Sequence, residues 1–304
     1  MKEKNNLPNF LIVGAAKSGT SSLHNYLNQH PDIFMPSYTQ NGMKVKEPRF
    51  LITKLVKERL HNGVWDFDSY CELFKNSDAH SLVGESTVLY LYYYDEAIKN
   101  IKKYLGSNVK IVIMLRNPIE RAYSAYNFLK RKGIREQLSF EQALENEFLR
   151  MKNPNETPMI FYKKMGLYFD SVKAYLDNFK DVHIIFYDDF SANTEKSVSD
   201  TISFLGASTQ PLIDTKKRYN VGGKNWRFNW IRSLFLEENA FKKVTKYILP
   251  KSFRKSVAKV LISIFTRRAI KMQESTRRSL INYYREDVSN LSELLGKDLK
   301  HWLK

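Results

Sequence analysis

The sequence predicts an α/β fold in which helices flank a central parallel sheet. Three short apolar runs have the composition of strands, at residues 10–13, 109–115 and 182–187. Residues 109–115 are apolar at nearly every position after Lys110, which is typical of a parallel strand that helices cover on both faces. Strands that alternate with helical segments indicate a parallel sheet, and such sheets bind ligands beyond the carboxyl ends of their strands.

Apolar residues three or four positions apart predict the helices between these strands. A small-residue loop follows the first strand, and helical spacing begins after it at residues 23–27. The same spacing follows the second strand at residues 119–126 and precedes the third strand at residues 168–179. Residues 280–295 predict a final amphipathic helix that packs on the core.

Length and composition favour one domain over residues 1–304. A chain of 304 residues, 43% of them hydrophobic, can bury a sizeable core. No internal repeat and no low-complexity linker divides the sequence. Residues 241–272 contain many lysines and arginines and no acidic residue, with apolar residues at helical spacing. We therefore expect a single domain with a basic amphipathic helical insertion at about 236–275.

Charge and cysteine content narrow the classes of function. The formal net charge of +17 attracts anions: nucleotides, nucleic acids, sulfated or carboxylated glycans, or an acidic membrane surface. The single cysteine, Cys71, can form neither a disulfide framework nor a cysteine zinc site. No apolar run has the length of a membrane span or the form of a signal peptide. We expect a cytoplasmic location, with peripheral contact to a membrane as a further option.

The segment GAAKSGTSS, residues 14–22, lies at the predicted junction between the first strand and its helix. Free backbone N–H groups and the positive end of a helix make such a junction an anion site. Small residues let the backbone wrap a phosphate, hydroxyls add donors and Lys17 adds a cation. The alternative is an ordinary Ser or Thr helix cap after a glycine turn. In the P-loop of ATPases and nucleotide kinases the lysine follows the second glycine, whereas Lys17 precedes Gly19, which argues against those enzymes.

This loop resembles the 5′-phosphosulfate-binding loop of the sulfotransferases, and a second motif of that family follows in order. The run IVIMLR ends at Arg116 and continues as NPIERAYS to Ser124. It resembles the family's strand, followed by Arg-[Asp/Asn]-Pro and a serine on the next helix. The resemblance implies a P-loop-like sulfotransferase core that uses 3′-phosphoadenosine-5′-phosphosulfate (PAPS), closest to the glycosaminoglycan (heparan sulfate) enzymes and their bacterial relatives. It places Arg116 and Ser124 on the 3′-phosphate, which suits the planar fork of an arginine.

Further segments resemble the same group of sulfotransferases. KEPRFL, residues 46–51, is similar to its Glu-x-His-Phe-Phe segment, and GESTVLY, residues 84–90, to its Glu-Lys-[Ser/Thr]-Pro-x-Tyr strand. Residues 215–220 fall where the family places a loop over the nucleotide, and residues 294–302 resemble its ending. The sequence departs from the family pattern at three positions, which are Arg49 in place of histidine, Ser86 in place of lysine and Lys217 in place of glycine.

The resemblance implies roles for individual residues. Glu47 is expected to be the base that takes the acceptor's proton; Glu85 is the competing base, and a plain surface carboxylate is the alternative for Glu47. Lys17 would neutralise charge on the bridging phosphate oxygen of the donor. The expected contacts to the acceptor come from Lys46, Arg49 and Glu85. The expected contacts to the donor come from Lys17, Ser18, Gly19, Thr20, Ser21, Ser22, Arg116, Ser124, Lys216, Lys217, Arg218, Tyr219 and Asn220.

The expected reaction is an in-line displacement that moves the sulfonate of PAPS to a hydroxyl or amine and leaves adenosine 3′,5′-bisphosphate (PAP). We expect no metal and a glycan acceptor, while lipid and small-metabolite acceptors stay open. Two other classes remain: a peripheral membrane binder that uses residues 241–272, and a nucleic-acid binder driven by the net charge. We prefer membrane contact as a second property of the enzyme and expect no nucleic-acid partner. A nucleotide kinase would need the P-loop order and an acidic magnesium site.

Overall fold

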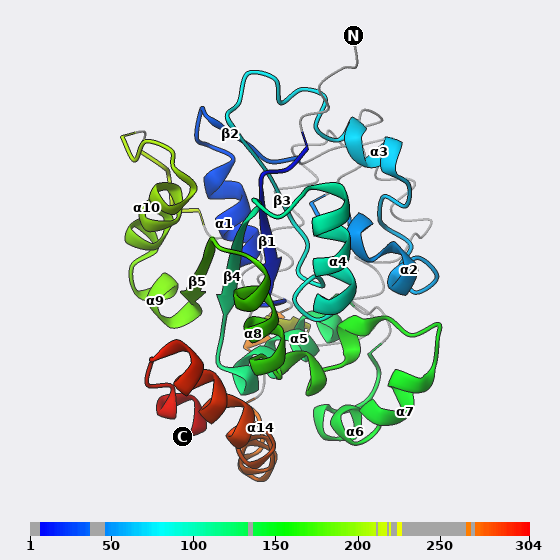
Figure 1. Cartoon of the computed structure of the whole chain (residues 1–304). Helices are drawn as coiled ribbons and strands as arrows, with labels where there is room; N and C mark the ends of the chain where they lie inside the picture. The colour runs from blue at the N-terminus through cyan, green and yellow to red at the C-terminus, as the bar shows by residue number, and fades with distance from the viewer. Residues whose placement is uncertain are drawn as a thin grey trace, which may run out of the picture.

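The centre of the molecule is a five-stranded parallel sheet (Figure 1). The computed structural model describes residues 7–36, 46–132, 136–210, 212–217, 219 and 271–304, and the backbone of residues 224–226 and 266–268. The strand order in the sheet is β2-β3-β1-β4-β5. The strands are β1 (Phe10–Gly14), β2 (Ile33–Phe34), β3 (Leu82–Ser86), β4 (Lys110–Leu115) and β5 (Val182–Phe186). The α/β fold with a parallel sheet is therefore confirmed.

The three strands predicted from apolar runs all form, with bounds that differ by one residue at one end. β1 extends to Gly14, β4 begins at Lys110, and β5 ends at Phe186 because Tyr187 begins the next helix. β2 was not predicted, since two residues are too few to show a periodicity. It pairs in parallel with β3 at the edge of the sheet.

β1 is the central strand, and each of its five residues is buried. Leu11 aligns with Glu85 of β3 on one side and with Ile111 of β4 on the other. The carboxyl ends of β1, β3 and β4 therefore meet at one edge of the sheet. In Figure 1 the arrowheads of β1 and β4 point to the lower side, where α5 lies.

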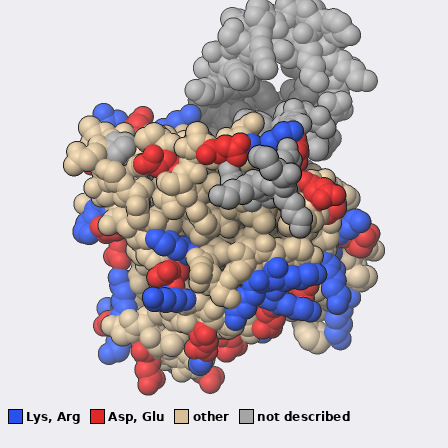
Figure 2. All heavy atoms as spheres, turned by 45° about the horizontal axis from the view of Figure 1, so that its top comes forward, with Lys and Arg blue, Asp and Glu red and all other residues tan. Residues whose placement is uncertain are grey.

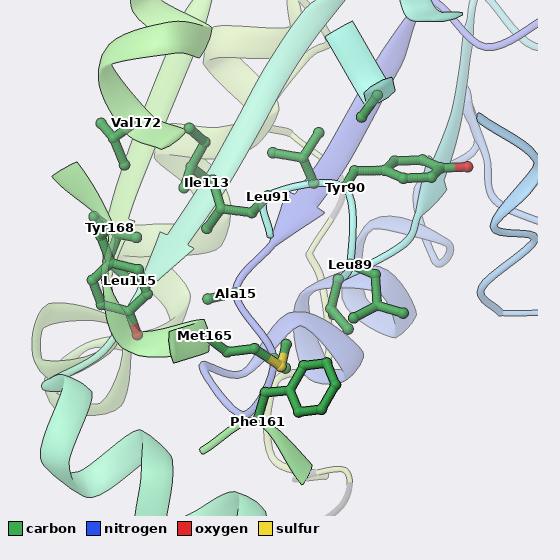
Figure 3. Packing of buried hydrophobic residues seen from close by; sticks show 14 of the residues in the cluster. Ala15, Leu89, Tyr90, Leu91, Ile113, Leu115, Phe161, Met165, Tyr168 and Val172 are labelled. Carbon is green, nitrogen blue, oxygen red and sulfur yellow. The ribbon is translucent and has the colours of Figure 1, made fainter. Parts of the chain in front are cut away.

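Helices cover both faces of the sheet, as the alternation of side chains along β1 requires. Phe10 and Ile12 pack with α1, α9 and α10, whereas Leu11 and Val13 pack in a larger cluster with α4, α5, α8 and α14. Figure 3 shows part of the larger cluster, with Ile113 and Leu115 of β4 and the segment from Leu89 to Leu91. These helices are α1 (Thr20–Leu27), α4 (Tyr94–Tyr104), α5 (Pro118–Lys132), α8 (Phe169–Asn178), α9 (Tyr187–Ala192), α10 (Thr194–Leu205) and α14 (Glu274–Leu295).

Short helices complete the larger layer. They are α2 (Thr53–Val56), α3 (Phe67–Glu72), α6 (Phe140–Glu145) and α7 (Glu147–Lys152), with 3-10 turns η1 (Phe50–Ile52), η2 (Pro158–Ile160), η3 (Lys164–Gly166) and η4 (Lys300–Leu303). None of the helices in the described ranges combines the length and the apolar character that crossing a lipid bilayer demands.

The final amphipathic helix predicted from the tail is α14. It buries Leu280, Tyr284, Val288 and Leu291, which recur three or four positions apart. Asp287 on the same helix accepts the backbone N–H groups of Tyr168 and Phe169 at 2.8 and 3.1 Å. α14 therefore fixes the beginning of α8 as well as covering the core.

The basic insertion expected at about 236–275 lies mostly outside the described residues. Within it, Thr266–Arg268 form strand β7, which pairs antiparallel with β6 (Lys224–Trp226). These three residues differ from the helix predicted there, because backbone pairing with a distant segment overrides a local helical pattern.

Figure 2 shows one face of the molecule, on which several Lys and Arg side chains lie together in a patch.

Candidate active site

The loop between β1 and α1 has a backbone that only a few residue types adopt easily. Gly19 has φ 97° and Lys17 has φ 71°, both in the left-handed region. A glycine meets this at little cost, whereas a lysine there must be held by its surroundings. Gly14 is needed for another reason: a Cβ atom on it would lie 2.5 Å from Cβ of Leu91. The loop passes close to the segment after β3.

Ser18 places a buried polar group in this loop. Its side chain is fully buried, and its hydroxyl oxygen has no hydrogen-bond partner among the described residues. A buried hydroxyl without a partner costs free energy unless a ligand supplies one. The first N–H groups of α1 lie next to it and lack partners within the helix by geometry. These residues fit a phosphate or sulfate group.

Lys17 contacts α5, the helix that follows β4. Its ammonium nitrogen lies 4.0 Å from the centre of the Phe128 ring, in a cation–π contact. Ser124 is one turn earlier on α5 and is partly buried. Residues four apart lie on the same face of a helix, so Ser124 belongs to the face of α5 that Phe128 turns toward Lys17.

Arg116 joins the second signature to the loop. One guanidinium nitrogen, Nη1, donates a hydrogen bond to the backbone oxygen of Lys17 at 3.2 Å. The guanidinium also lies over the ring of Tyr187, 4.5 Å from its centre. The backbone oxygen of Arg116 accepts the hydroxyl of Tyr168 at 3.1 Å. Arg116 is therefore held on three sides beside the phosphate loop.

The next residue, Asn117, fixes the turn from β4 into α5. Its side-chain oxygen accepts the N–H groups of Ile119 and Glu120 at 3.0 and 3.3 Å, as a helix cap does. Its side-chain nitrogen donates to the backbone oxygen of Trp302 at 3.1 Å. Trp302 in turn donates its indole N–H to Asp188 at 2.9 Å. The end of the chain thus clamps the turn that carries Arg116.

Residues 214–217 and Tyr219 lie against α1. The hydroxyl of Tyr26 is within hydrogen-bond distance of the backbone oxygens of Thr215 and Lys217, at 3.1 and 3.0 Å. The N–H of Tyr219 donates to the hydroxyl oxygen of Ser22 at 3.3 Å. The loop expected over the nucleotide therefore lies beside the phosphate loop. Arg218 and Asn220 are outside the described residues.

Glu47 lies between two cations. Its carboxylate accepts from Lys46 and from Arg49, each at 3.3 Å. Burial by itself raises the pKa of Glu47, but the charges and hydrogen bonds of Lys46 and Arg49 outweigh it and lower the pKa. The carboxylate is therefore ionised at neutral pH. The side-chain nitrogen Nε of Arg49 is buried without a partner among the described residues, as is the hydroxyl of Ser18.

A second carboxylate, Glu85, is enclosed beneath this segment. It is fully buried on β3 and accepts hydrogen bonds from the hydroxyls of Tyr70 and Thr87 at 3.3 and 3.2 Å. Burial is the largest influence and raises the pKa of Glu85 to about 7, although hydrogen bonds from Tyr90, Thr87 and Tyr70 act against it.

The side chain of Ser86, the residue after Glu85 on β3, points to the opposite face of the sheet. Its hydroxyl is hydrogen-bonded to Nδ1 of the buried His24 at 2.7 Å. The hydroxyl that stands in place of the family's lysine thus contacts α1.

Thr87 connects the acidic segment to the phosphate loop. Its hydroxyl accepts the N–H of Arg49 at 3.3 Å, and its own N–H donates to the backbone oxygen of Ile12 at 3.1 Å. Ile12 is two residues before the end of β1, from which the loop emerges. The structure thus gathers all the predicted segments that it describes around the end of β1.

A family model for the sulfotransferase domain matches residues 7–259 of the chain. The chain belongs to the sulfotransferase family. A crystal structure of a sulfotransferase from Alicyclobacillus acidocaldarius superimposes with a TM-score of 0.72 and 30% identity. That alignment covers 98% of this chain and 99% of the bacterial one. Its extent agrees with the resemblance drawn from the motifs, which runs from the first strand to the last residues.

Curated sulfotransferases match a shorter part of the chain. The membrane-associated sulfotransferase kil1 of Dictyostelium discoideum is 31% identical over 146 residues, which are 46% of this chain and 28% of that protein. The human bifunctional heparan sulfate N-deacetylase/N-sulfotransferase 2 is 30% identical over 43% of this chain and 14% of its own. Human carbohydrate sulfotransferase 15 is 25% identical over 40% of this chain and 27% of its own length. The chain thus matches less than a third of the length of these relatives.

Several residues of this sulfotransferase site were not predicted. Phe128 beneath Lys17, Tyr187 beneath Arg116 and Tyr70 beside Glu85 all come from helices distant in sequence. Only Phe128 had a usable signal, since it lies four residues after Ser124 and just beyond the helical spacing predicted at residues 119–126. Within the described part of the chain, no three His, Cys, Asp or Glu side chains are placed to hold a metal ion together.

Proposed function

We propose that this sulfotransferase moves the sulfonate group of PAPS onto a hydroxyl or amine of a glycan. The observation that carries the proposal is the hydrogen bond between Arg116 and the backbone oxygen of Lys17. It holds the Arg116 guanidinium beside the loop that carries Lys17, although the two residues are 99 positions apart in sequence. A donor with phosphate groups at both its 5′ and 3′ positions requires two anion sites at a fixed separation.

The donor would be held by the residues expected from the sequence. Residues 17–22 would hold the 5′-phosphosulfate, with the hydroxyl of Ser18 and the N–H groups at the start of α1 as donors. Arg116 and Ser124 would hold the 3′-phosphate. Lys216, Lys217 and Tyr219, together with Arg218 and Asn220, would lie over the nucleotide. The contact of Tyr219 with Ser22 supports this placement.

The chemistry follows from the groups at the end of β1. The acceptor oxygen or nitrogen attacks sulfur as the bond from sulfur to the bridging phosphate oxygen breaks, so that PAP leaves with that electron pair. Lys17 would stabilise the charge on the leaving oxygen. Glu47 would take the proton that the acceptor loses. Its low pKa keeps it ionised at neutral pH, which is the state that a base needs. No step requires a metal.

A glycan acceptor is supported by the relatives and by charge. Two of the curated relatives are named for heparan sulfate and for carbohydrate sulfation. Lys46 and Arg49 would contact the acceptor, and the unpartnered Nε of Arg49 is a donor for it. Glu85 was expected to contact the acceptor too, but its carboxylate is enclosed and bonded to two hydroxyls. The structure therefore favours Glu47 over Glu85 as the base.

Titration with PAP tests the donor site by calorimetry. We expect PAP to bind more tightly than adenosine 5′-phosphate, and Lys17→Ala and Arg116→Ala each to weaken PAP. Arg116→Ala should remove most of the preference for the 3′-phosphate, whereas Lys17→Ala should leave the preference in place. Equal affinity of the wild type for PAP and adenosine 5′-phosphate would contradict the proposed donor.

A survey with ³⁵S-labelled PAPS across N-desulfated heparin, glycolipids and small alcohols tests the reaction and its acceptor. We expect the label to enter the polysaccharide, and Glu47→Gln to reduce that turnover by roughly a hundredfold or more while PAP affinity is retained. Label in a lipid or a small alcohol alone would reassign the acceptor. Full turnover of the Glu47→Gln variant would remove Glu47 from the mechanism.

The cytoplasmic location stays a prediction, and so does contact with anionic membrane through residues 241–272. The relative named as membrane-associated supports the second. Flotation with phosphatidylserine vesicles tests the membrane contact: protein that stays at the bottom of the gradient argues against it. A nucleic-acid binder would instead show a steep salt dependence of DNA affinity and no preference for PAP.

A further inference from the structure

Glu85 accepts hydrogen bonds from two hydroxyls, and a third hydroxyl lies beside its carboxylate. Tyr70 donates to Oε1 at 3.3 Å and Thr87 donates to Oε2 at 3.2 Å. The hydroxyl of Tyr90 faces the carboxylate and acts to lower the pKa of Glu85. All four side chains are fully buried. Glu85 is therefore the centre of a closed polar cluster inside the larger core.

Two of these hydroxyls also hold the backbone of the segment that carries Glu47. The hydroxyl of Thr87 accepts the N–H of Arg49 at 3.3 Å, and that of Tyr90 accepts the N–H of Leu51 at 3.3 Å. Each hydroxyl has a single hydrogen. Because the hydroxyl accepts the N–H group with a lone pair, its hydrogen points elsewhere. The hydrogen of each hydroxyl is thus directed to Glu85, whose two carboxyl oxygens can accept both.

The segment needs such a restraint because its backbone is strained. Arg49 has φ 61°, a left-handed conformation that side chains other than glycine seldom adopt. Strained residues persist only where the surroundings determine their conformation. After Arg49 the chain is anchored by the buried Phe50, Leu51 and Ile52. Before it lies Glu47, whose carboxylate reaches back to the Arg49 guanidinium.

We infer that Glu85 is a positioning residue: through the hydroxyls of Thr87 and Tyr90 it holds residues 47–51 in the one conformation that presents Glu47 to the acceptor. The inference deepens the proposed function and rests on it for the role of Glu47. The holding of the segment itself does not depend on that role.

The cluster should also respond to pH. Burial raises the pKa of Glu85 to about 7. The titratable groups that face it are Tyr70 from α3, Tyr90 from the turn after β3, Tyr175 from α8 and Glu47 from the strained segment. Of these, only Glu47 is charged at neutral pH. The closed core holds the proton of Glu85 more tightly than an opened cluster would, because opening returns the carboxyl toward water and lowers its pKa. The segment should therefore loosen as pH rises through about 7.

Hydrogen–deuterium exchange of the full chain tests the inference without any acceptor. The readout is the protection of the N–H groups of Arg49 and Leu51, corrected for the intrinsic pH dependence of exchange. Thr87→Val should lower the protection of Arg49 by about tenfold, which corresponds to one net hydrogen bond, whereas Thr87→Ser should restore it. Glu85→Gln should lower the protection of both N–H groups. The N–H of Thr87, which donates to β1, reports in Glu85→Gln that the surrounding fold is intact.

The pH dependence distinguishes positioning from simple packing. In the wild type the corrected protection of Arg49 and Leu51 should fall between pH 6 and pH 8, and in Glu85→Gln it should stay level. Protection that is the same in wild type and Glu85→Gln at both pH values would overturn the inference. So would an equal loss in Thr87→Ser and Thr87→Val.

Turnover separates this inference from the proposed function. With ³⁵S-labelled PAPS and N-desulfated heparin, Glu85→Gln should cost about tenfold to a hundredfold, as expected of a misplaced base. In a Glu47→Gln background the same change should cost less than about twofold, because the two residues act through one group. Losses that multiply would show that Glu85 acts by itself. An inactive wild type would contradict the proposed acceptor and leave the exchange result standing.

Discussion

Nη1 of Arg116 donates to the backbone oxygen of Lys17 across 3.2 Å. The arginine comes from the end of β4 and the lysine from the loop after β1, which are adjacent parallel strands. The bond holds together the two segments that we propose as the anion sites for the donor. A preformed site avoids the cost of ordering side chains on binding.

The first prediction concerns the shape of the cation at this contact. Arg116→Lys keeps the charge but loses the planar fork and the stacking on Tyr187. We expect PAP to bind about tenfold to a hundredfold more weakly, since a hydrogen bond to a charged group is worth about 1.5–3 kcal/mol. Calorimetry measures the affinity of PAP for the variant and the wild type. Arg285→Lys, at an exposed position of α14, is the matched control and should leave the affinity of PAP unchanged.

The second prediction is that Ser18→Ala raises the free energy of unfolding and lowers the affinity for PAP. The buried hydroxyl has no partner among the described residues, so its removal should raise the free energy of unfolding by about 1 kcal/mol. The same change should weaken PAP about tenfold, because the donor loses one hydrogen bond. Urea denaturation and calorimetry measure the two effects.

Ser77→Ala is the control for Ser18→Ala. Ser77 is also fully buried, but its hydroxyl donates to the backbone oxygen of Phe74 at 2.6 Å. That variant should lose stability and keep the affinity of PAP. A loss of stability in Ser18→Ala as large as in Ser77→Ala would show that the hydroxyl of Ser18 has a structural partner.

The third prediction separates the two functions of Asn117. Asn117→Ala removes the cap of α5 and the bond to the Trp302 backbone, and we expect the free energy of unfolding to fall by about 2 kcal/mol. Asn117→Asp keeps an acceptor for the cap and loses only the donor, so its loss should be smaller. Urea denaturation measures both variants. Equal losses would mean that the cap contributes little.

The fourth prediction is a pH dependence of stability with a definite sign. Folding raises the pKa of Glu85 from 4.5 to about 7, so the folded state holds this proton more tightly than the unfolded chain. The stability that this proton contributes is complete below pH 4.5 and is lost as pH rises through about 7. Between pH 5 and pH 8 the free energy of unfolding of the wild type should fall by about 3 kcal/mol relative to Glu85→Gln. Parallel pH profiles for the two proteins would contradict it.

The parts of the fold that a pattern within a short stretch of sequence specifies were predictable. Residues 10–13 and 111–115 are apolar at successive positions, and the glycine, lysine and hydroxyls of residues 14–22 follow the first of them directly. The order of Lys17 and Gly19 was enough to separate this loop from that of the kinases. Local pattern thus identified the sheet, the loop and the family.

What could not be predicted depends on contacts between distant segments. The sequence placed Glu85 beside a family motif and suggested a base or an acceptor contact. It gave no sign that Tyr70 from α3 would close over the carboxylate. β7 was assigned to a helix because its partner β6 lies some forty residues away. Burial and long-range pairing decide such positions, and neither is written in a local pattern.

The clamp between Asn117 and Trp302 has a consequence for synthesis on the ribosome. The two residues are 185 positions apart. The turn that carries Arg116 leaves the exit tunnel long before its partner has been translated. A nascent chain can contain β1, β4 and the phosphate loop early, but the turn gains its bond to the Trp302 backbone only when that residue has emerged.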